Sequence, residues 1–307
     1  MSKSFRGRDV ISIRDFTRDD LITIFKEADS MEPYAKTKVD ILKGKIMALM
    51  FFEPSTRTKL SFEAAMKRLG GDVIGFSEPS MTSIAKGESL IDTARVVENY
   101  ADIIVIRHPN EGAAKAVAEA VDIPVINAGS GALSHPTQAL IDLYSMWKEK
   151  GSIDGLTVLF LGDLKYSRTV RSLIYGLLNF KVNFILVSPE LLKLKDEVRG
   201  QLKDAGVSYV ERSSLTSDVI READVIYVTR IQRERFADPM EYERVKGSYR
   251  LSLESLKEAK RDLIILHPLP RVDEMDIELD KTAYAKYFKQ VFYGLLVRMA
   301  LLKLILS

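Results

Sequence analysis

The sequence predicts an α/β protein made of two domains, each a mostly parallel β-sheet flanked by helices. The chain has 307 residues, about the length of two domains of roughly 150 residues each. Short apolar or β-branched runs recur along it and alternate with segments of helical periodicity, a pattern typical of βαβ units. The segment GSIDG at 151–155 separates two sets of these runs near the middle of the chain.

Four strands are expected in each half. Those of the first half are the runs KIMALMFF, DVIGF, DIIVIRH and IPVINA, at residues 45–52, 72–76, 102–108 and 123–128. Those of the second half are LTVLFLG, VNFILVS, DVIYVTR and DLIILH, at residues 156–162, 182–188, 224–230 and 262–267. Because helical patterns separate consecutive runs, each set favours a parallel sheet.

Local signals place helices between these runs. Thr17 followed by Asp20 is expected to open an early helix, and Pro136 to open the helix of HPTQALIDLYSMWKE. Gly70 and Gly71 are expected to end the helix of LSFEAAMKRL.

These elements predict where the domains begin and end. The first domain is expected at residues 1–134, a connecting helix at 135–150, and the second domain at 151–285. The apolar segment 286–307 is expected to form a buried helix that packs back on the first domain.

The composition excludes several classes of protein. With a net charge of +2 and no long block of like charges, a nucleic-acid-coating role is disfavoured. The absence of cysteine excludes disulfides, thiolate metal sites and a cysteine nucleophile. The three histidines, His108, His135 and His267, lack a metal-ligand spacing, so no metal site is expected.

No membrane-associated segment is expected. The N-terminus lacks the apolar stretch of a signal peptide. The C-terminal run LLVRMALLKLILS is interrupted by Arg298 and Lys303 and is shorter than the roughly 20 residues that span a bilayer. A cytoplasmic location follows from these two observations.

Basic residues follow most of the predicted strands. In open parallel sheets, ligands bind at the carboxyl ends of the strands. Of six such ends, five carry an arginine and the sixth leads through a glycine-rich loop to His135; the arginines are Arg57, Arg107, Arg168, Arg230 and Arg271. In a chain of nearly zero net charge this predicts a cleft for a highly anionic ligand or pair of ligands. The alternative, that each arginine is a solvated loop end, stays open at this point.

The segment FFEPSTRTKLSFE is the most informative of these strand ends. Pro54 ends the strand and a helix begins around residues 55–58, so the hydroxyls of Ser55, Thr56 and Thr58 gather with the Arg57 guanidinium at a helix N-terminus. Exposed first-turn amides and the helix dipole make such an end a phosphate site. Simple helix capping would explain one hydroxyl, but not three and an arginine.

Three motifs together resemble one family. STRT at 55–58, HPTQ at 135–138 and HPLP at 267–270 resemble, in order and spacing, the aspartate/ornithine carbamoyltransferase family, and the similarity runs from Gly7 to Leu304. The HPLP motif without cysteine and the segment TRIQRER at 229–235 are similar to the aspartate-specific members of that family. The resemblance implies transfer of the carbamoyl group of carbamoyl phosphate to the α-amine of L-aspartate. The products would be N-carbamoyl-L-aspartate and phosphate, in de novo pyrimidine biosynthesis.

The resemblance also implies how the first domain and its neighbours bind carbamoyl phosphate. Ser55, Thr56, Arg57, Thr58 and Arg107 would hold its phosphate. Ser83 and Lys86 would reach into the site of a neighbouring chain, so the active sites would be shared within a homotrimer. Taken alone, the loop that carries Ser83 and Lys86 is typical of a solvated turn.

The remaining site residues are implied in the same way. His135 would polarise the carbamoyl carbonyl together with Arg57 and Thr58, while Lys86 completes the catalytic set. Gln138 and the carbonyls around Leu269 and Pro270 would accept from the carbamoyl amide. The carboxylates of aspartate would be held by Arg168, Arg230 and Gln232.

The implied mechanism is direct attack of the amine on the carbamoyl carbon in a cleft between the domains, with no cofactor. Glu53 and Arg235 would form an interdomain pair that closes this cleft. Whether a separate regulatory chain binds stays open.

Three segments depart from the family pattern: AGSGALSH before His135, YSRTVR at 166–171, and Lys59 after STRT. They concern the loop before His135 and the charge near Arg168 rather than the matched ligands themselves.

Three alternatives remain at this stage: a carbamoyltransferase for another amino acid, a dinucleotide-binding dehydrogenase and a non-catalytic anion-binding scaffold. The dehydrogenase is disfavoured because the segment VLFLGDLKYS lacks a full GxGxxG motif. The scaffold is disfavoured by the intact set of matched ligands.

Overall fold

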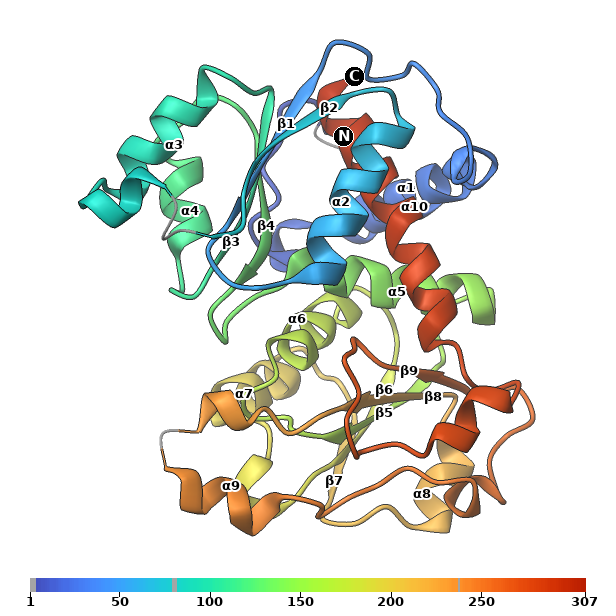
Figure 1. Ribbon diagram of the computed structural model, residues 1–307. Helices are drawn as coiled ribbons and strands as arrows, with labels where there is room; N and C mark the ends of the chain where they lie inside the picture. Colours follow the sequence, from blue (N-terminus) through green and yellow to red (C-terminus); the bar gives the residue numbers. More distant parts are fainter. Residues whose placement is uncertain (1–3, 79–81, 237) are drawn as a thin grey trace. The chain divides into compact units, whose positions relative to one another are not determined.

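The computed structural model describes residues 4–78, 82–236 and 238–307, and the chain divides into two compact units (Figure 1). Unit 1 consists of Met1–Ile141 and Phe292–Ser307, and unit 2 of Asp142–Val291. Each unit contains one parallel β-sheet flanked by helices, which confirms the predicted α/β class with two sheets. The division falls inside helix α5 (Pro136–Lys150), which continues unbroken from one unit into the other.

The sheet of unit 1 has the strand order β2-β1-β3-β4, with every neighbouring pair parallel. Its strands are β1 (Ile46–Phe51), β2 (Asp72–Phe76), β3 (Ile103–His108) and β4 (Val125–Ser130), which confirms the four predicted runs. Alternate side chains of β1, such as Ala48 and Met50, pack with Ala94 and Val117 of the helices on one face. Burial of a side chain such as Leu or Ile in this way contributes roughly 1.5–3 kcal/mol.

The sheet of unit 2 has the order β7-β6-β5-β8-β9 and is also parallel throughout. Its strands are β5 (Thr157–Gly162), β6 (Asn183–Val187), β7 (Tyr209–Arg212), β8 (Val225–Thr229) and β9 (Ile264–Leu266). The edge strand β7 is additional to the four strands predicted for this half. Its sequence, YVER, has only two apolar residues and both remain partly exposed, so hydrophobic periodicity does not reveal it.

The helices lie on both faces of each sheet. In unit 1, α2 covers one face and α3 and α4 cover the other (Figure 1). The helices of the chain are α1 (Arg18–Met31), α2 (Thr56–Arg68), α3 (Leu90–Glu98), α4 (Ala113–Ala118), α5, α6 (Arg168–Leu177), α7 (Asp196–Asp204), α8 (Ser217–Glu222), α9 (Pro239–Val245) and α10 (Tyr287–Leu306). Thr17 and Asp20 form a capping box at the start of α1, as their spacing predicts.

Helix α10 is the most apolar of these helices, and its residues from Phe292 onward belong to unit 1. Arg298 lies over the ring of Phe62 in α2, 4.8 Å from the ring centroid, and Lys303 pairs with Glu27 of α1 at 2.7 Å. Among the described residues, no helix is long and apolar enough to cross a membrane.

Gly162, the last residue of β5, lies close to Thr229 of β8 and to Tyr249. Its φ is +119°, and a Cβ atom built there would lie 2.3 Å from the carbonyl oxygen of Thr229 and 2.5 Å from the hydroxyl of Tyr249. A larger residue at this position therefore needs both an unfavourable backbone conformation and a displaced neighbour.

We expect Gly162→Ala to lower the free energy of unfolding by about 2 kcal/mol or more. Gly200→Ala is the matched control, because Gly200 lies inside helix α7 and nothing lies within 4 Å of the position that its Cβ would take. It should raise the stability by about 0.5–1 kcal/mol through helix propensity. Chemical denaturation of both variants checks the pair, and equal stabilities would contradict the close approach at Gly162.

Candidate active site

The N-terminus of helix α2 presents polar groups without using them to cap itself. Ser55 occupies the cap position, but its side chain makes no capping hydrogen bond. In helix α1, by contrast, the cap residue Thr17 accepts from the amide of Asp20 at 3.2 Å. Thr56 and Arg57 are exposed and Thr58 is buried. The first turn of α2 therefore places hydroxyls and amides at a helix N-terminus whose cap residue makes no side-chain capping bond.

Arg107 links three neighbouring strand ends of unit 1. Its Nε lies 3.4 Å from Oε2 of Glu53, which follows β1, and its Nη1 donates to the carbonyl of Ala128 in β4 at 3.3 Å. The ring of His108 packs 4.7 Å from that of Phe52, measured between centroids. Since the strands are parallel, these contacts bring the ends of β1, β3 and β4 together at one edge of the sheet, where α2 also begins.

The sequence indicated Arg235 as a partner of Glu53. Within unit 1, Glu53 contacts Arg107 at 3.4 Å. Arg235 belongs to unit 2, in the short helix η6 (Arg233–Arg235), so the pair between Glu53 and Arg235 stays a prediction.

His135 is buried immediately before helix α5 and keeps one ring nitrogen occupied. Its Nδ1 lies 3.4 Å from both the backbone nitrogen of Gln138 and the hydroxyl of Thr137. A backbone amide can only donate, so Nδ1 acts as the acceptor and the neutral ring carries its proton on Nε2. This tautomer is the one that can donate a hydrogen bond to a carbonyl oxygen.

The loop before His135 is held by hydrogen bonds that its backbone amides donate. The amide of Ser130 donates to the carbonyl of Ser134 at 3.0 Å, and Oδ1 of Asn127 accepts from the amide of Gly129 at 2.9 Å. Gly131 has a φ of +49° and donates to the carbonyl of His108 at 3.1 Å. The departures from the family pattern in this loop therefore lie on a turn that its own backbone holds.

Ser83 and Lys86 lie in the short helix η4 (Ser83–Lys86), and both are exposed. Thr82 caps this turn by accepting from the amide of Ile84 at 3.4 Å. The turn packs against α3, which covers the face of the sheet opposite to α2 (Figure 1). Residues 79–81 of the same loop lie outside the described residues.

In unit 2, Arg168 and Asp163 occupy the end of β5. Arg168 is the first residue of helix α6 and only 8% exposed, and Ser167 caps the helix. Asp163 is fully buried, and its Oδ1 accepts from the amide of Tyr166 at 2.9 Å. Burial raises the pKa of Asp163 to about 6, although the backbone amides of Tyr166, Gln232 and Lys165 act in the opposite direction. Sequence reasoning missed Asp163, although a carboxylate directly after a buried strand is a signal for it.

Arg230 follows β8, the strand that neighbours β5. Its Nη1 donates to Oε2 of Glu234 at 3.2 Å, and its Nη2 makes a second, short contact with Oε1 of the same carboxylate. Burial acts to lower the pKa of Arg230, but the hydrogen bonds and charge of Glu234 raise it overall. Gln232 lies between them in sequence, with its backbone amide facing Asp163. Arg230 is therefore already bound in fork geometry to a carboxylate of its own chain.

The HPLP segment follows β9, on the far side of β8 from β5. Leu269 has a φ of +55°, and the Leu269–Pro270 peptide bond is cis. Arg271, a predicted anion ligand by its position, is instead paired with Asp280 through both terminal nitrogens, one of them at 2.6 Å, and lies over the ring of Tyr287. Arg271 is thus engaged in a pair within unit 2.

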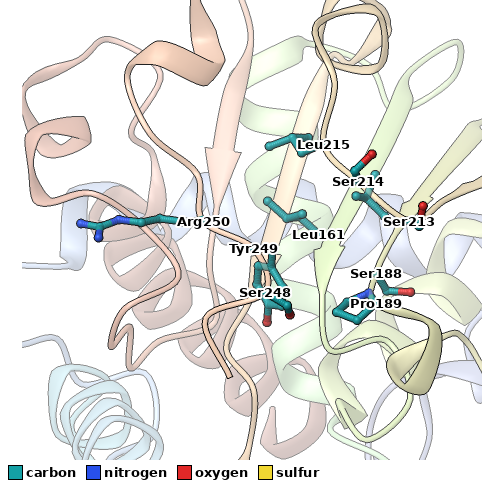
Figure 2. A pocket seen from close by; sticks show the side chains of 10 residues that line it. Leu161, Ser188, Pro189, Ser213, Ser214, Leu215, Ser248, Tyr249 and Arg250 are labelled. Carbon is teal, nitrogen blue, oxygen red and sulfur yellow. The ribbon is translucent and has the colours of Figure 1, made fainter. Parts of the chain in front are cut away.

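A pocket of about 240 Å³ opens at the carboxyl ends of β5, β6 and β7, and Figure 2 shows the residues that line it. None of the predicted site residues is among them. Arg250 points away from the other lining side chains (Figure 2), and its Nε pairs with Asp276. This pocket therefore lacks the cationic groups that a dianionic substrate requires.

Taken together, two open parallel sheets with arginines and a helix N-terminus at their strand ends define an α/β enzyme that binds anionic substrates. The family models narrow this class. The carbamoyl-P binding domain of aspartate/ornithine carbamoyltransferases matches residues 8–148, and the Asp/Orn binding domain matches residues 154–305. The chain belongs to the aspartate/ornithine carbamoyltransferase family.

Individual relatives agree over almost the full length. The aspartate carbamoyltransferase catalytic subunit of Pyrobaculum islandicum is 58% identical over 303 residues, which is 99% of each chain. The catalytic subunit of M. jannaschii aspartate transcarbamoylase is similar in structure, with a TM-score of 0.89, 52% identity, and 96% and 97% of the two chains covered. The Trypanosoma cruzi enzyme in complex with carbamoyl phosphate and aspartate has a TM-score of 0.92 at 37% identity, covering 99% of this chain and 96% of that one.

The buried carboxyl of Asp163 predicts a pH dependence of stability. Its pKa is higher in the folded chain than the ordinary value of 3.8, so its favourable contribution is present below that value and is lost as pH rises through about 6. At pH 8 the ionised group costs on the order of 3 kcal/mol. Asp163→Asn removes this ionisation while leaving an acceptor for the Tyr166 amide.

We expect the stability of Asp163→Asn relative to the native chain to improve by about 2 kcal/mol between pH 4.5 and pH 8. Denaturant unfolding at both pH values measures this difference. Asp204→Asn, at an exposed position of α7, is the control and should show no such change. A relative stability of Asp163→Asn that is flat with pH would rule out the buried ionisation.

Proposed function

We propose that this chain catalyses transfer of the carbamoyl group from carbamoyl phosphate to the α-amine of L-aspartate, yielding N-carbamoyl-L-aspartate and phosphate. Membership of the family and 54–58% identity to catalytic subunits of aspartate carbamoyltransferases support this activity and this amino acid. The observation that carries the proposal is the start of helix α2, where Ser55 leaves its own helix uncapped beside the edge of the sheet that holds Arg107.

The phosphate of carbamoyl phosphate would lie at this helix end. Amides and hydroxyls donate to its oxygens, the helix dipole favours its negative charge, and the guanidinium groups of Arg57 and Arg107 neutralise it. The proposed ligands are Ser55, Thr56, Arg57, Thr58 and Arg107, with Ser83 and Lys86 of a neighbouring chain. Glu53 already contacts Arg107, so phosphate binding must weaken that pair or share the guanidinium with it.

The carbamoyl group would lie between His135, Gln138 and the carbonyls of Leu269 and Pro270. The proton that the contacts assign to Nε2 of His135 suits donation to the carbamoyl oxygen, together with Arg57 and Thr58. Gln138 and the two carbonyls would accept from the carbamoyl amide. These groups hold the carbonyl carbon in a fixed orientation and stabilise the negative charge that develops on its oxygen.

The chemical step would be direct attack. A bond forms between the aspartate nitrogen and the carbamoyl carbon, a tetrahedral intermediate collapses, and the bond from carbon to the phosphate oxygen breaks. The amine proton goes to the departing phosphate. This reaction step needs neither a covalent bond to the chain nor a cofactor.

Aspartate would bind through Arg168, Arg230 and Gln232 in unit 2. Both arginines follow neighbouring strands, which suits two carboxylates of one small molecule. Because Arg230 is held by Glu234, binding exchanges an internal carboxylate for that of the substrate. We further propose that the two units enclose the substrates in a cleft, whose closure excludes water and involves Glu53 and Arg235.

We also propose that the active sites are shared between chains of a homotrimer. The exposed Ser83 and Lys86 lie on the face of the sheet opposite to α2, which favours a role in a neighbouring site over a role in their own. The relatives are named catalytic subunits, a name that fits a separate regulatory chain as a further partner.

The activity is tested by measuring phosphate and N-carbamoyl-L-aspartate formed from carbamoyl phosphate with L-aspartate, with ornithine, or with no amine. We expect product only with L-aspartate. Arg168→Lys should raise the KM for aspartate about 10–100-fold, because lysine cannot form the bidentate pair. Arg221→Lys, on the surface and paired with Glu258, is the control and should leave all constants unchanged. Phosphate release that does not depend on aspartate would refute the function.

Shared sites are tested by mixing two inactive chains, Lys86→Ala and His135→Ala. If Lys86 acts in the neighbouring site, exchange of subunits yields some sites with both residues intact, and we expect activity of up to about one quarter to one third of the native level. Native mass spectrometry verifies the exchange. Mixed trimers that remain inactive would exclude a shared site.

A further inference from the structure

The turn that carries Leu269 and Pro270 is held by a buried pair of side chains, His267 and Glu274, which are only 2% and 3% exposed. Nδ1 of His267 accepts from the amide of Leu269 at 2.8 Å, and Nε2 contacts Oε1 of Glu274 at 2.7 Å. The tautomer follows from these contacts, because a ring nitrogen that accepts from an amide leaves the proton on the other one. Both ring nitrogens are therefore used inside the turn.

Glu274 completes the turn from its other end. Its Oε2 accepts from the amides of Val272 and Asp273, at 3.0 and 3.1 Å. The carboxylate thus receives three hydrogen bonds, one from His267 and two from the backbone. Burial raises the pKa of Glu274, but the hydrogen bond and charge of His267 and the backbone amides outweigh it and leave the pKa lowered. At neutral pH the ionised carboxylate of Glu274 can only accept hydrogen bonds, and each of its three contacts needs an acceptor.

A second set of buried contacts ties the same turn to helix α5. The amide of His267 donates to Oε1 of Gln290 at 3.1 Å, and Nε2 of Gln290 donates to Oδ1 of Asp142 at 2.6 Å. Tyr227, from the interior strand β8, donates to Oδ2 of Asp142 at 2.8 Å. Asp142, Gln290 and Tyr227 are all buried, so these hydrogen bonds lie in a medium of low dielectric constant, where a mismatched donor or acceptor is costly.

Asp142 stands four residues after Gln138 on α5, and positions four apart share one face of a helix. Under the proposed function, Gln138 and the carbonyls of Leu269 and Pro270 all accept from the carbamoyl amide. The buried contacts therefore reach from the turn of Leu269 and Pro270 to the helix that carries Gln138.

We propose that Glu274 and His267 are positioning residues for the carbamoyl group. Through Gln290 and Asp142 they fix the carbonyls of the turn relative to helix α5. This inference rests on the proposed function, because it concerns the same bound amide. It assigns a role in substrate affinity to side chains whose burial otherwise suggests only a contribution to folding.

The test is Glu274→Gln, which keeps the size of the side chain and changes only its polarity. The amide of the glutamine variant has only one acceptor oxygen, whereas His267 on one side and the backbone amides of Val272 and Asp273 on the other side all donate. The NH2 group of the variant must therefore face a donor on one of these two sides. We expect the KM for carbamoyl phosphate to rise about tenfold, equivalent to the roughly 1.4 kcal/mol of a disturbed buried hydrogen bond. The KM for aspartate should stay within about twofold of the native value.

Glu258→Gln is the matched control, because Glu258 forms an exposed surface pair with Arg221 in the same unit. It should leave every constant unchanged. A double-mutant cycle of Glu274→Gln with Gln138→Ala separates positioning from folding. If both changes weaken binding of the same carbamoyl amide, the free-energy change derived from the KM of the double variant should be clearly smaller than the sum of the two single-variant changes.

Should Glu274→Gln not fold, His267→Asn and His267→Ala decide the question. The Oδ1 of asparagine can replace Nδ1 as acceptor for the Leu269 amide, so His267→Asn should recover at least about fivefold in KM for carbamoyl phosphate over His267→Ala. Equal impairment of the two variants would overturn the proposal.

The outcomes separate the two levels of inference. A lowered Tm of Glu274→Gln with native kinetic constants overturns the positioning role and leaves the proposed function intact. Additive effects in the double-mutant cycle overturn it as well. A native chain that forms no N-carbamoyl-L-aspartate refutes the proposed function itself.

Discussion

Both sheets are parallel throughout, and this polarity is the constraint on which the site depends. Parallel strands have their carboxyl ends at the same edge of the sheet, so segments that are distant in sequence lie close together there. In unit 1 the edge joins Glu53, Arg107 and Ala128 by contacts of 3.3–3.4 Å. In unit 2 it joins the loops of Asp163 and Thr229. The close approach at Gly162 shows how tightly the second edge is packed, since a single added carbon would meet a backbone oxygen.

Arginines at the strand ends of each sheet bring positive charge that nearby carboxylates balance. The chain supplies its own carboxylates for this purpose: Glu53 for Arg107, Glu234 for Arg230 and Asp280 for Arg271. Under the proposed function, substrate binding at Arg107 or Arg230 would exchange one anion for another, and its free energy would be a difference between two similar interactions. Such an exchange would keep the guanidinium groups oriented before binding, and it would limit how tightly each anion is held.

The sequence predicted the strands that carry long apolar runs, because burial on both faces leaves a strong signal. It did not predict β7, whose four residues stay partly exposed at a sheet edge. Motif resemblance indicated candidate ligand residues, but not the buried polar groups near them. Asp163, Glu274 and Gln290 act through backbone amides or other side chains, and such contacts depend on three-dimensional proximity rather than on residue spacing. The sequence also did not indicate the contact between Glu53 and Arg107, which neighbouring strand ends bring together.

The orientation of the proposed carbamoyl site depends on the same kind of contact at two places. Nδ1 of His135 is close to a backbone amide at the start of α5, and Nδ1 of His267 accepts from a backbone amide in the turn after β9. In each case the local contact settles which nitrogen carries the proton. Under the proposed function, the His135 proton would be donated to a substrate oxygen, whereas the His267 proton is donated to Glu274. Two histidines with the same tautomer would then have different tasks, because a buried carboxylate stands beside the ring of His267.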